Sequence, residues 1–182
     1  MDREELEREL ERLHEACWAW VLACCGRDRE LAEEALQTSY LRILSGRARF
    51  DGRSALRTWV FGVIRRTAME ELRGHRRRRL REGADSVTAP DVSDPTPGAD
   101  VTVERSDERA ALLAALSALS SRQREVLELV FYHGLTVEEA AAVMQISVGS
   151  ARTHYDRGKK ALALALAPGV APVRRPDRQV AL

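Results

Sequence analysis

The sequence predicts an all-α protein: two small helical domains joined by a flexible acidic linker. Apolar residues recur at helical spacing through most of the chain, and no stretch alternates apolar and polar residues as a half-buried strand does. Glycine, serine or threonine stands at the expected helix boundaries. Residues 84–103 contain prolines and aspartates but no basic residue. We therefore expect helical domains at 1–83 and 104–167, a flexible linker at 84–103 and a disordered tail at 168–182.

The first domain is expected to contain three helices. Apolar spacing predicts helices over 4–25 and 29–44, and Gly26 and Gly46 end them. A short polar loop follows over 48–54, and Ser54 is expected to cap a third helix that runs to about residue 79. This helix loses its apolar face as arginine accumulates, which indicates that it leaves the core and meets an anion or solvent. Eight arginines lie between 65 and 81: Arg65, Arg66, Arg73, Arg76, Arg77, Arg78, Arg79 and Arg81.

The second domain is expected to contain four helices. After a helix over 104–119, Ser120 and Gln123 form a capping box for a helix that ends before Gly134. Thr136 and Glu139 form a second capping box, which opens a helix over 137–144. Ser147 is expected to cap the last helix, which ends by residue 167 because proline follows.

The last two helices predict a helix-turn-helix. Gln145 must take the left-handed conformation at the joint, at a cost of about 1 kcal/mol. Ala151, Tyr155 and Leu162 are expected to face the core, so the second helix is free to enter a major groove. Its outer face carries Ser150, Arg152, Thr153, Asp156, Arg157 and Lys160, with Lys159 placed to attract phosphate. The alternative is a three-helix packing unit with a solvated basic face.

Composition limits the possible functions. No apolar run approaches the ~20 residues of a membrane span, and the acidic, amphipathic N-terminus is no secretory signal. We therefore expect a cytoplasmic protein without membrane insertion. The net charge of +1 hides the separation between the arginine-rich helix and the acidic linker. Nucleophile triads, phosphate-cradling glycine loops and metal-spaced ligands are missing from the sequence, so we expect neither an enzyme nor a cofactor or small-molecule substrate.

The cysteines allow two interpretations. Cys17, Cys24 and Cys25 are an odd set, which argues against a disulfide framework. His14, Cys17 and Cys24 fall near one helical face, so a metal site or thiol switch is one interpretation. The favoured one is that these cysteines are small core residues.

Two segments together resemble the sigma-70 family of transcription initiation factors, in its small extracytoplasmic-function (ECF) group. LSSRQREVLELVFYHGLTVEEAAAVMQISVGSARTHYDRGKKAL resembles region 4, in which RQREV, GLS-x-EEIA and ISVGTVKSRLHRAR are common. RELAEEALQTSYLRIL and FDGRSALRTWVFGVIRR are similar to the region 2 segments AEDLVQETFLR and FRG-SSFRTWLYRIARN. The resemblance covers about residues 4–166, with the segments in the family's order.

The resemblance implies a non-enzymatic protein that binds core RNA polymerase and promoter DNA, and that is held by an anti-sigma factor. Matching the polymerase-binding helix are Ala32, Glu33, Glu34, Leu36, Gln37 and Tyr40. Matching the loop that captures a flipped base of the −10 element are Arg49, Phe50, Asp51, Gly52, Arg53 and Ser54, with Arg57, Arg65 and Arg66 tracking phosphates. In region 4, the exposed face described above matches the −35 reader, and Arg124 and Thr136 match phosphate contacts.

Several residues depart from the family pattern. Arg66 replaces a usual Asn and Glu70 a usual Asp, while Asp156 and Gly158 are unusual in a recognition helix. An aspartate near DNA repels phosphate unless it accepts from a cytosine amine. Asp85, Asp91, Asp94 and Asp100 suit a linker that mimics nucleic acid, or a plain solubilising tether.

Two other functions remain as alternatives. One is a conventional helix-turn-helix regulator, although the N-terminal half lacks the alternating strands of a receiver domain. The other is a relative that binds polymerase or an inhibitor but no longer opens DNA. Under the leading interpretation, the near-neutral charge predicts that the free chain binds DNA weakly. Specific binding is expected to need polymerase, which holds both domains at the required spacing.

Overall fold

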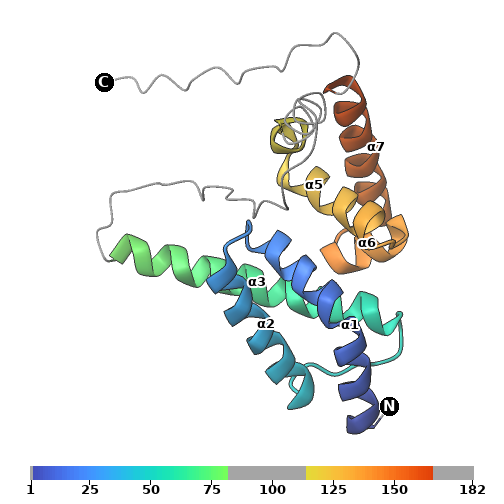
Figure 1. Cartoon of the computed structure of the whole chain (residues 1–182). Coiled ribbons are helices and arrows are strands. Elements are labelled where there is room, and N and C mark those ends of the chain that lie inside the picture. The colour runs from blue at the N-terminus through green and yellow to red at the C-terminus, as the bar shows by residue number, and fades with distance from the viewer. Residues whose placement is uncertain (1, 82–113, 166–182) are drawn as a thin grey trace, which may run out of the picture.

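A computed structural model describes residues 2–81 and 114–165, and within these ranges it contains helices and no strands. The N-terminal domain consists of α1 (Arg3–Cys24), α2 (Arg29–Leu44) and α3 (Leu56–Arg81). The C-terminal domain contains a helical stretch over 114–118 and the helices that follow it. These are α5 (Ser121–Leu127), the π-helical turn η1 (Glu128–Tyr132), α6 (Val137–Met144) and α7 (Val148–Ala165). Figure 1 shows the three N-terminal helices below and the C-terminal ones above.

The three N-terminal helices surround one apolar core. Asp2 caps α1 and Asp28 caps α2, each accepting a hydrogen bond from a backbone N–H in the first helical turn. Cys17, Val21 and Ile64 are fully buried where the helices meet. The predicted bounds of α2 are confirmed, and those of α1 differ by one residue at each end.

Local sequence signals define the C-terminal domain. Both predicted capping boxes are present: Ser120 with Gln123 opens α5, and Thr136 with Glu139 opens α6. Gly134 follows η1 with a φ of 65°, and Gln145 follows α6 with a φ of 55°, so the predicted left-handed joint is confirmed. Ser147 accepts a hydrogen bond from the Ser150 N–H at 3.1 Å, which confirms it as the cap of α7.

The two domains pack against each other. Helix α6 lies on α3, and apolar residues of both domains form one continuous cluster that includes Trp20, Phe61 and Leu129. Figure 1 shows α6 above α3. The sequence had indicated two modules related only by a linker, so this contact is a finding of the structure. It includes ring contacts of Trp20 and Phe61 with His133 of the other domain, and burial of these apolar rings favours the contact.

Some expectations differ from the structure or lie outside it. Ser54 does not cap α3: the helix begins at Leu56, and the Ser54 hydroxyl donates to the Ala55 carbonyl instead. The linker 84–103 and the tail 168–182 lie outside the described residues, as does most of the helix expected over 104–119. Among the helices described, none is long and apolar enough to cross a membrane.

Candidate nucleic-acid interface

Helix α7 presents the polar face that the sequence predicts. Ala151 is fully buried and Tyr155 is half-buried, so this side of the helix packs on the domain core. The opposite side is exposed at all six predicted positions, namely Ser150, Arg152, Thr153, Asp156, Arg157 and Lys160. A helix held by its apolar side, with hydroxyls and cations on the other, has the arrangement needed to read a major groove.

Gly158 has a structural explanation. A Cβ atom built at this position would lie 2.9 Å from Cδ1 of Leu127 and 3.4 Å from Cβ of Gln123. Glycine thus lets α7 approach α5 closely, at the cost of some helix propensity. The departure from the family pattern concerns packing within the domain, since Gly158 is buried away from the exposed face.

Arg152 has a partner within the domain. Its Nη2 donates to Oε1 of Glu138, on α6, at 2.7 Å, and both side chains are largely exposed. This hydrogen bond is the main cause that lowers the pKa of the Glu138 carboxyl. Thr153 donates its hydroxyl to the Gly149 carbonyl at 2.9 Å, so its outward surface is mainly the methyl group. An exposed ion pair exchanges readily, so Arg152 stays available to a stronger anion.

The three predicted phosphate contacts have local partners as well. Arg124 is exposed, and its guanidinium donates to the carbonyls of Leu116, Ser117 and Leu119, where the preceding helix ends. The hydroxyl of Thr136 accepts from the Glu139 N–H, leaving the start of α6 at the surface. Lys159 lies over the Tyr155 ring, with Nζ 5.1 Å from its centre.

The loop before α3 is open to solvent. Arg49, Asp51, Gly52, Arg53 and Ser54 are exposed, whereas Phe50 is half-buried. The Phe50 ring packs on Trp59 with their centres 5.3 Å apart, which anchors the loop to α3. Gly52 has a φ of 73°, so it permits a tight turn that other residues rarely adopt. Such a loop places backbone groups where an extruded base can reach them.

The three predicted phosphate-contacting arginines of α3 lie in different environments. Arg66 is exposed as expected. Arg57 is half-buried and lies over the Phe61 ring, and its Nε is buried without a hydrogen-bond partner in the described structure. Arg65 does not lie at the surface in this structure: its side chain is only 6% exposed and its guanidinium is paired with Glu125 of α5. Domain packing, rather than DNA, surrounds it.

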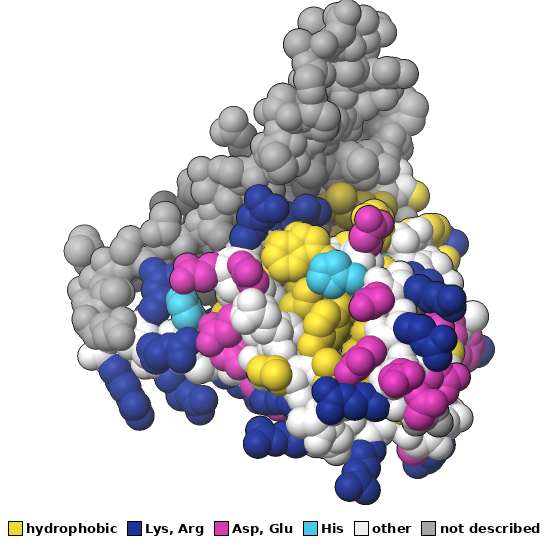
Figure 2. All heavy atoms as spheres, turned by 60° about the horizontal axis from the view of Figure 1, so that its bottom comes forward, with side chains coloured by type: hydrophobic (Ala, Val, Ile, Leu, Met, Phe, Trp, Pro, Cys, Tyr) yellow, Lys and Arg dark blue, Asp and Glu magenta, His cyan; other side chains and the backbone are white. Residues whose placement is uncertain are grey.

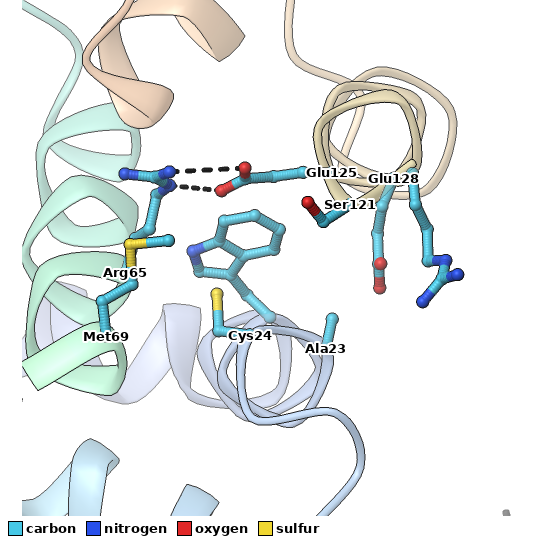
Figure 3. Close-up of a pocket in the computed structure, with 9 residues that line it drawn as sticks. Ala23, Cys24, Arg65, Met69, Ser121, Glu125 and Glu128 are labelled. Atoms are coloured by element: carbon cyan, nitrogen blue, oxygen red, sulfur yellow. Dashed lines mark hydrogen bonds and ion pairs between the residues drawn. The ribbon is translucent and has the colours of Figure 1, made fainter. Parts of the chain in front are cut away.

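Arg65 and Glu125 border a small pocket between the domains. Arg65 and Glu125 form two hydrogen bonds, one of them between Nη2 and Oε2 at 3.3 Å. Figure 3 shows this pair pointing across the pocket, with Cys24 and Glu128 on its other sides. The pocket has a volume of about 130 Å³. Burial is the main cause that raises the pKa of the Glu128 carboxyl.

His133 is an interface residue that sequence reasoning missed. It follows η1 and is 2% exposed, with its ring edge-on to Phe61 and Trp20 at centre distances of 4.9 and 5.7 Å. Among the residues that the structure describes, none forms a hydrogen bond with its Nε2. Burial, and next the Arg57 charge, lower the pKa of His133 to about 4, so the imidazole is neutral. The π-helical turn before it gave no signal in the sequence.

On α2 the predicted polymerase-binding residues fall on two faces. Glu33, Glu34 and Gln37 are exposed. Ala32 and Leu36 are 0% and 5% exposed and pack in the domain core, so in this structure they do not face the surface. Leu41, which the sequence did not single out, is a large apolar side chain that is 69% exposed, one helical turn beyond Gln37.

Tyr40 borders a hollow between α1 and α2. The hollow has a volume of about 380 Å³ and is lined by Glu7, Leu10, Glu11, His14, Tyr40 and Leu44. The Tyr40 hydroxyl lies 3.2 Å from Nδ1 of His14. Figure 2 shows the face at the bottom of Figure 1, with apolar side chains beside a histidine and acidic groups around them. Tyr40 is therefore half in the core and half at the surface.

The cysteines pack in the interior. Cys17 and Cys25 are 0% and 3% exposed, which confirms the interpretation as core residues. Burial raises the pKa of the Cys17 thiol to about 11 and that of Cys25 to about 12, so both are poor nucleophiles. His14 is exposed, and its Nδ1 lies 3.2 Å from the Tyr40 hydroxyl. Across residues 2–81 and 114–165, no group of three or more His, Cys, Asp or Glu has the geometry of a metal site.

Comparisons with known proteins agree with this arrangement. Family models described as "Sigma-70 region 2" and "Sigma-70, region 4" match residues 9–78 and 109–162. The chain is 32% identical over 148 residues to ECF RNA polymerase sigma factor EcfG of Rhodopseudomonas palustris, covering 81% of this chain and 77% of that one. It is 29% identical over 137 residues to ECF RNA polymerase sigma factor SigX of Bacillus subtilis, covering 75% and 71%.

The fold also matches a solved structure. The sigma factor RpoE of Bartonella quintana, in complex with the anti-sigma factor NepR, superposes with a TM-score of 0.70. That match covers 92% of this chain and 99% of that one at 23% identity. The two family models together span both domains, in the order in which α1–α3 and α5–α7 follow along the chain. The chain belongs to the ECF RNA polymerase sigma factors.

Proposed function

We propose that this sigma factor reads the −35 element of its promoters with the exposed face of α7 and the −10 element with the loop before α3. The observation that supports it most directly is that all six predicted α7 side chains are exposed on a helix fixed by its buried Ala151. Arg157 and Lys160 have the charge to attract DNA, and Arg152 and Thr153 add hydrogen-bonding and methyl contacts. The protein selects DNA and performs no reaction of its own.

Core RNA polymerase is proposed to bind the exposed face of α2. Glu33, Glu34 and Gln37 offer carboxylate and amide groups, and Leu41 offers a large apolar side chain on the same side of the helix. An exposed leucine among carboxylates fits a partner surface that carries basic side chains around an apolar patch. Tyr40, which the sequence also assigned to polymerase binding, is half-buried at the edge of this face.

The loop before α3 is proposed to hold an extruded base. Gly52 leaves room for the backbone to approach a base edge, and Arg49 and Arg53 are exposed beside it. Phe50, fixed on Trp59, gives the loop a rigid apolar floor. Arg66 is placed to follow the adjoining phosphates.

An anti-sigma factor is proposed as a further partner in the cytoplasm. The RpoE structure that this fold resembles was solved with the anti-sigma factor NepR, and the similar CnrH with the cytosolic domain of CnrY. The exposed α2 face is the natural target for such an inhibitor, because covering it would exclude polymerase.

The test is run-off transcription from a genomic fragment library with bacterial core RNA polymerase, with and without this chain. New start sites that share two short upstream elements support the proposal. Arg157→Ala should lose starts that depend on the upstream element, whereas the matched control Leu164→Ala, on an exposed part of α7 outside the proposed face, should keep them. Core binding without transcripts would indicate a non-initiating relative, and duplex binding without core binding a conventional regulator.

A further inference from the structure

The contact between the two domains uses residues that the proposed function assigns to DNA. Arg65 lies on α3, where the family resemblance places phosphate contacts, yet its guanidinium is bound to the carboxylate of Glu125. A carboxylate and a phosphate engage the same planar set of guanidinium N–H donors. While Glu125 holds Arg65, a DNA phosphate cannot use these donors.

The rest of the contact has the character of a specific interface. The His133 ring meets the stacked rings of Trp20 and Phe61 edge-on, and Leu129 is fully buried. The Thr58 hydroxyl donates to Oε1 of Glu139 at 3.4 Å, which ties the start of α3 to α6. Aromatic anchors surrounded by polar pairs are typical of surfaces that bind one partner.

The same contact is built so that it can open. Glu125 has a second partner within its own domain, since Nη1 of Arg122 lies 3.3 Å from its Oε2. Separation of the domains therefore leaves Glu125 paired on its own helix, and it exposes the Arg65 guanidinium without its carboxylate partner. The guanidinium is then available for charge-assisted hydrogen bonds to a phosphate, so a phosphate bound at Arg65 stabilises the separated state.

We infer that the α5–η1 face of region 4 is an interaction surface for α1 and α3 of region 2, and that it competes with single-stranded promoter DNA for Arg65. This inference rests on the proposed function, because that function places DNA at α3. The closed arrangement leaves the α7 face and the loop residues Gly52 and Arg53 exposed. Competition thus concerns the phosphate path along α3, and duplex reading by α7 stays available in both states.

The experiment uses the full chain and three variants. Glu125→Arg places a like charge against Arg65, and Glu125→Gln removes the charge with little change in volume. Glu128→Gln is the matched control, because Glu128 lines the same pocket one turn away and no hydrogen bond joins it to Arg65. Circular dichroism checks folding, small-angle X-ray scattering measures the radius of gyration, and fluorescence anisotropy measures binding of a labelled single-stranded oligonucleotide.

Glu125→Arg is expected to enlarge the radius of gyration and to bind the oligonucleotide more tightly. The gain should be about tenfold if the open state of the wild type holds about a tenth of the molecules. Glu125→Gln should show a smaller change in the same direction, and Glu128→Gln should match the wild type. If Glu125→Arg is misfolded, Glu125→Gln alone decides the inference by the same two measurements.

The inference is overturned if the variants of Glu125 keep the wild-type dimensions and oligonucleotide affinity, or if Glu128→Gln changes both as much as they do. These readouts need no polymerase, so they are separate from the proposed function. A chain that opens as expected but starts no transcripts would contradict the proposed function and leave the competition at Arg65 standing.

Discussion

Helices α3 and α7 both carry arginines that the sequence assigned to DNA, but the structure treats them differently. On α7, Arg152 and Arg157 are exposed. On α3, Arg65 is buried by the other domain and Arg57 lies over Phe61. The α7 face is defined by its own cap and by the spacing of its apolar residues, whereas the α3 face depends on which surface packs against it. A local sequence pattern therefore predicts the exposure of the α7 arginines well and that of the α3 arginines poorly.

The largest effect on this comparison is expected at Trp20, which joins the domains. Its Nε1 donates to the Phe61 carbonyl at 3.1 Å, and its ring contacts both Phe61 and His133. Trp20→Ala should lower the free energy of unfolding by about 3–5 kcal/mol, through lost burial and a cavity. Urea denaturation measures it, with Leu164→Ala as the exposed control. A loss near the control value would show that Trp20 is not central to the contact.

The next effect is a pH dependence that comes from His133. The unfolded chain binds a proton at pKa 6.5, whereas burial lowers the folded-state pKa to about 4. Protons therefore favour the unfolded chain as the pH falls below 6.5. Stability should be complete above that value and should decrease by on the order of 3 kcal/mol toward pH 4. Arg57, the charged group facing the ring, acts in the same direction.

Comparison with His133→Phe isolates this contribution. The phenyl ring keeps the contacts with Trp20 and Phe61 but cannot be protonated, so its stability curve should be flatter between pH 6.5 and 4. Urea denaturation of both proteins at several pH values gives the two slopes. Parallel curves would mean that His133 is already protonated, or solvated, in the folded protein.

Most of the fold could be predicted because its signals are local. The capping boxes of α5 and α6 depend on residues three positions apart, and the left-handed Gln145 depends on the joint around it. The bounds of α2 and α6 follow from these signals and from apolar spacing. The π-helical turn could not be predicted, since ELVFY fits an ordinary helix and the extra residue per turn serves to bury His133.

Whether a side chain of the candidate site is buried or exposed could be predicted only where this depends on the pattern of its own helix. Leu36 resembles a partner-binding residue in sequence, yet it is buried in the domain core, while Leu41 is exposed. Arg65 could be placed correctly only by knowing that Glu125, 60 positions away, lies against it. Gly158 was recognised as unusual, and its reason is the Leu127 side chain of another helix. Each miss involves contacts between distant parts of the chain.

A smaller effect is expected from the cap that positions the helix-turn-helix. Thr136→Ala removes the hydroxyl that accepts from the Glu139 N–H at 3.1 Å, and should cost about 1 kcal/mol. Thr136→Ser keeps this oxygen and should recover most of the loss. Thermal unfolding of the three proteins checks this. Equal losses in both variants would indicate that the Thr136 methyl group, rather than the cap, provides the stability.

The smallest effect on stability, and the sharpest test of α7, is expected from Glu138→Gln. Glu138 and Arg152 are both largely exposed, so loss of their ion pair should leave the melting temperature unchanged. Duplex DNA binding should become stronger, because Arg152 loses a competing anion. If Arg152 then neutralises one more phosphate, the plot of log affinity against log salt should steepen by about 0.9.

Two controls separate Arg152 from a general charge effect. Glu15→Gln removes one exposed carboxylate from α1, far along the chain from α7, and should alter neither affinity nor salt slope. Arg152→Ala should weaken duplex binding more in the Glu138→Gln background than in the wild type, because only there is the guanidinium unpaired. If Glu138→Gln instead weakens binding, Glu138 holds Arg152 in its base-reading orientation. The orientation of Arg152 on α7 would then depend on a residue of α6. Helices α7 and α3 would differ only in how strongly their arginines depend on neighbouring helices.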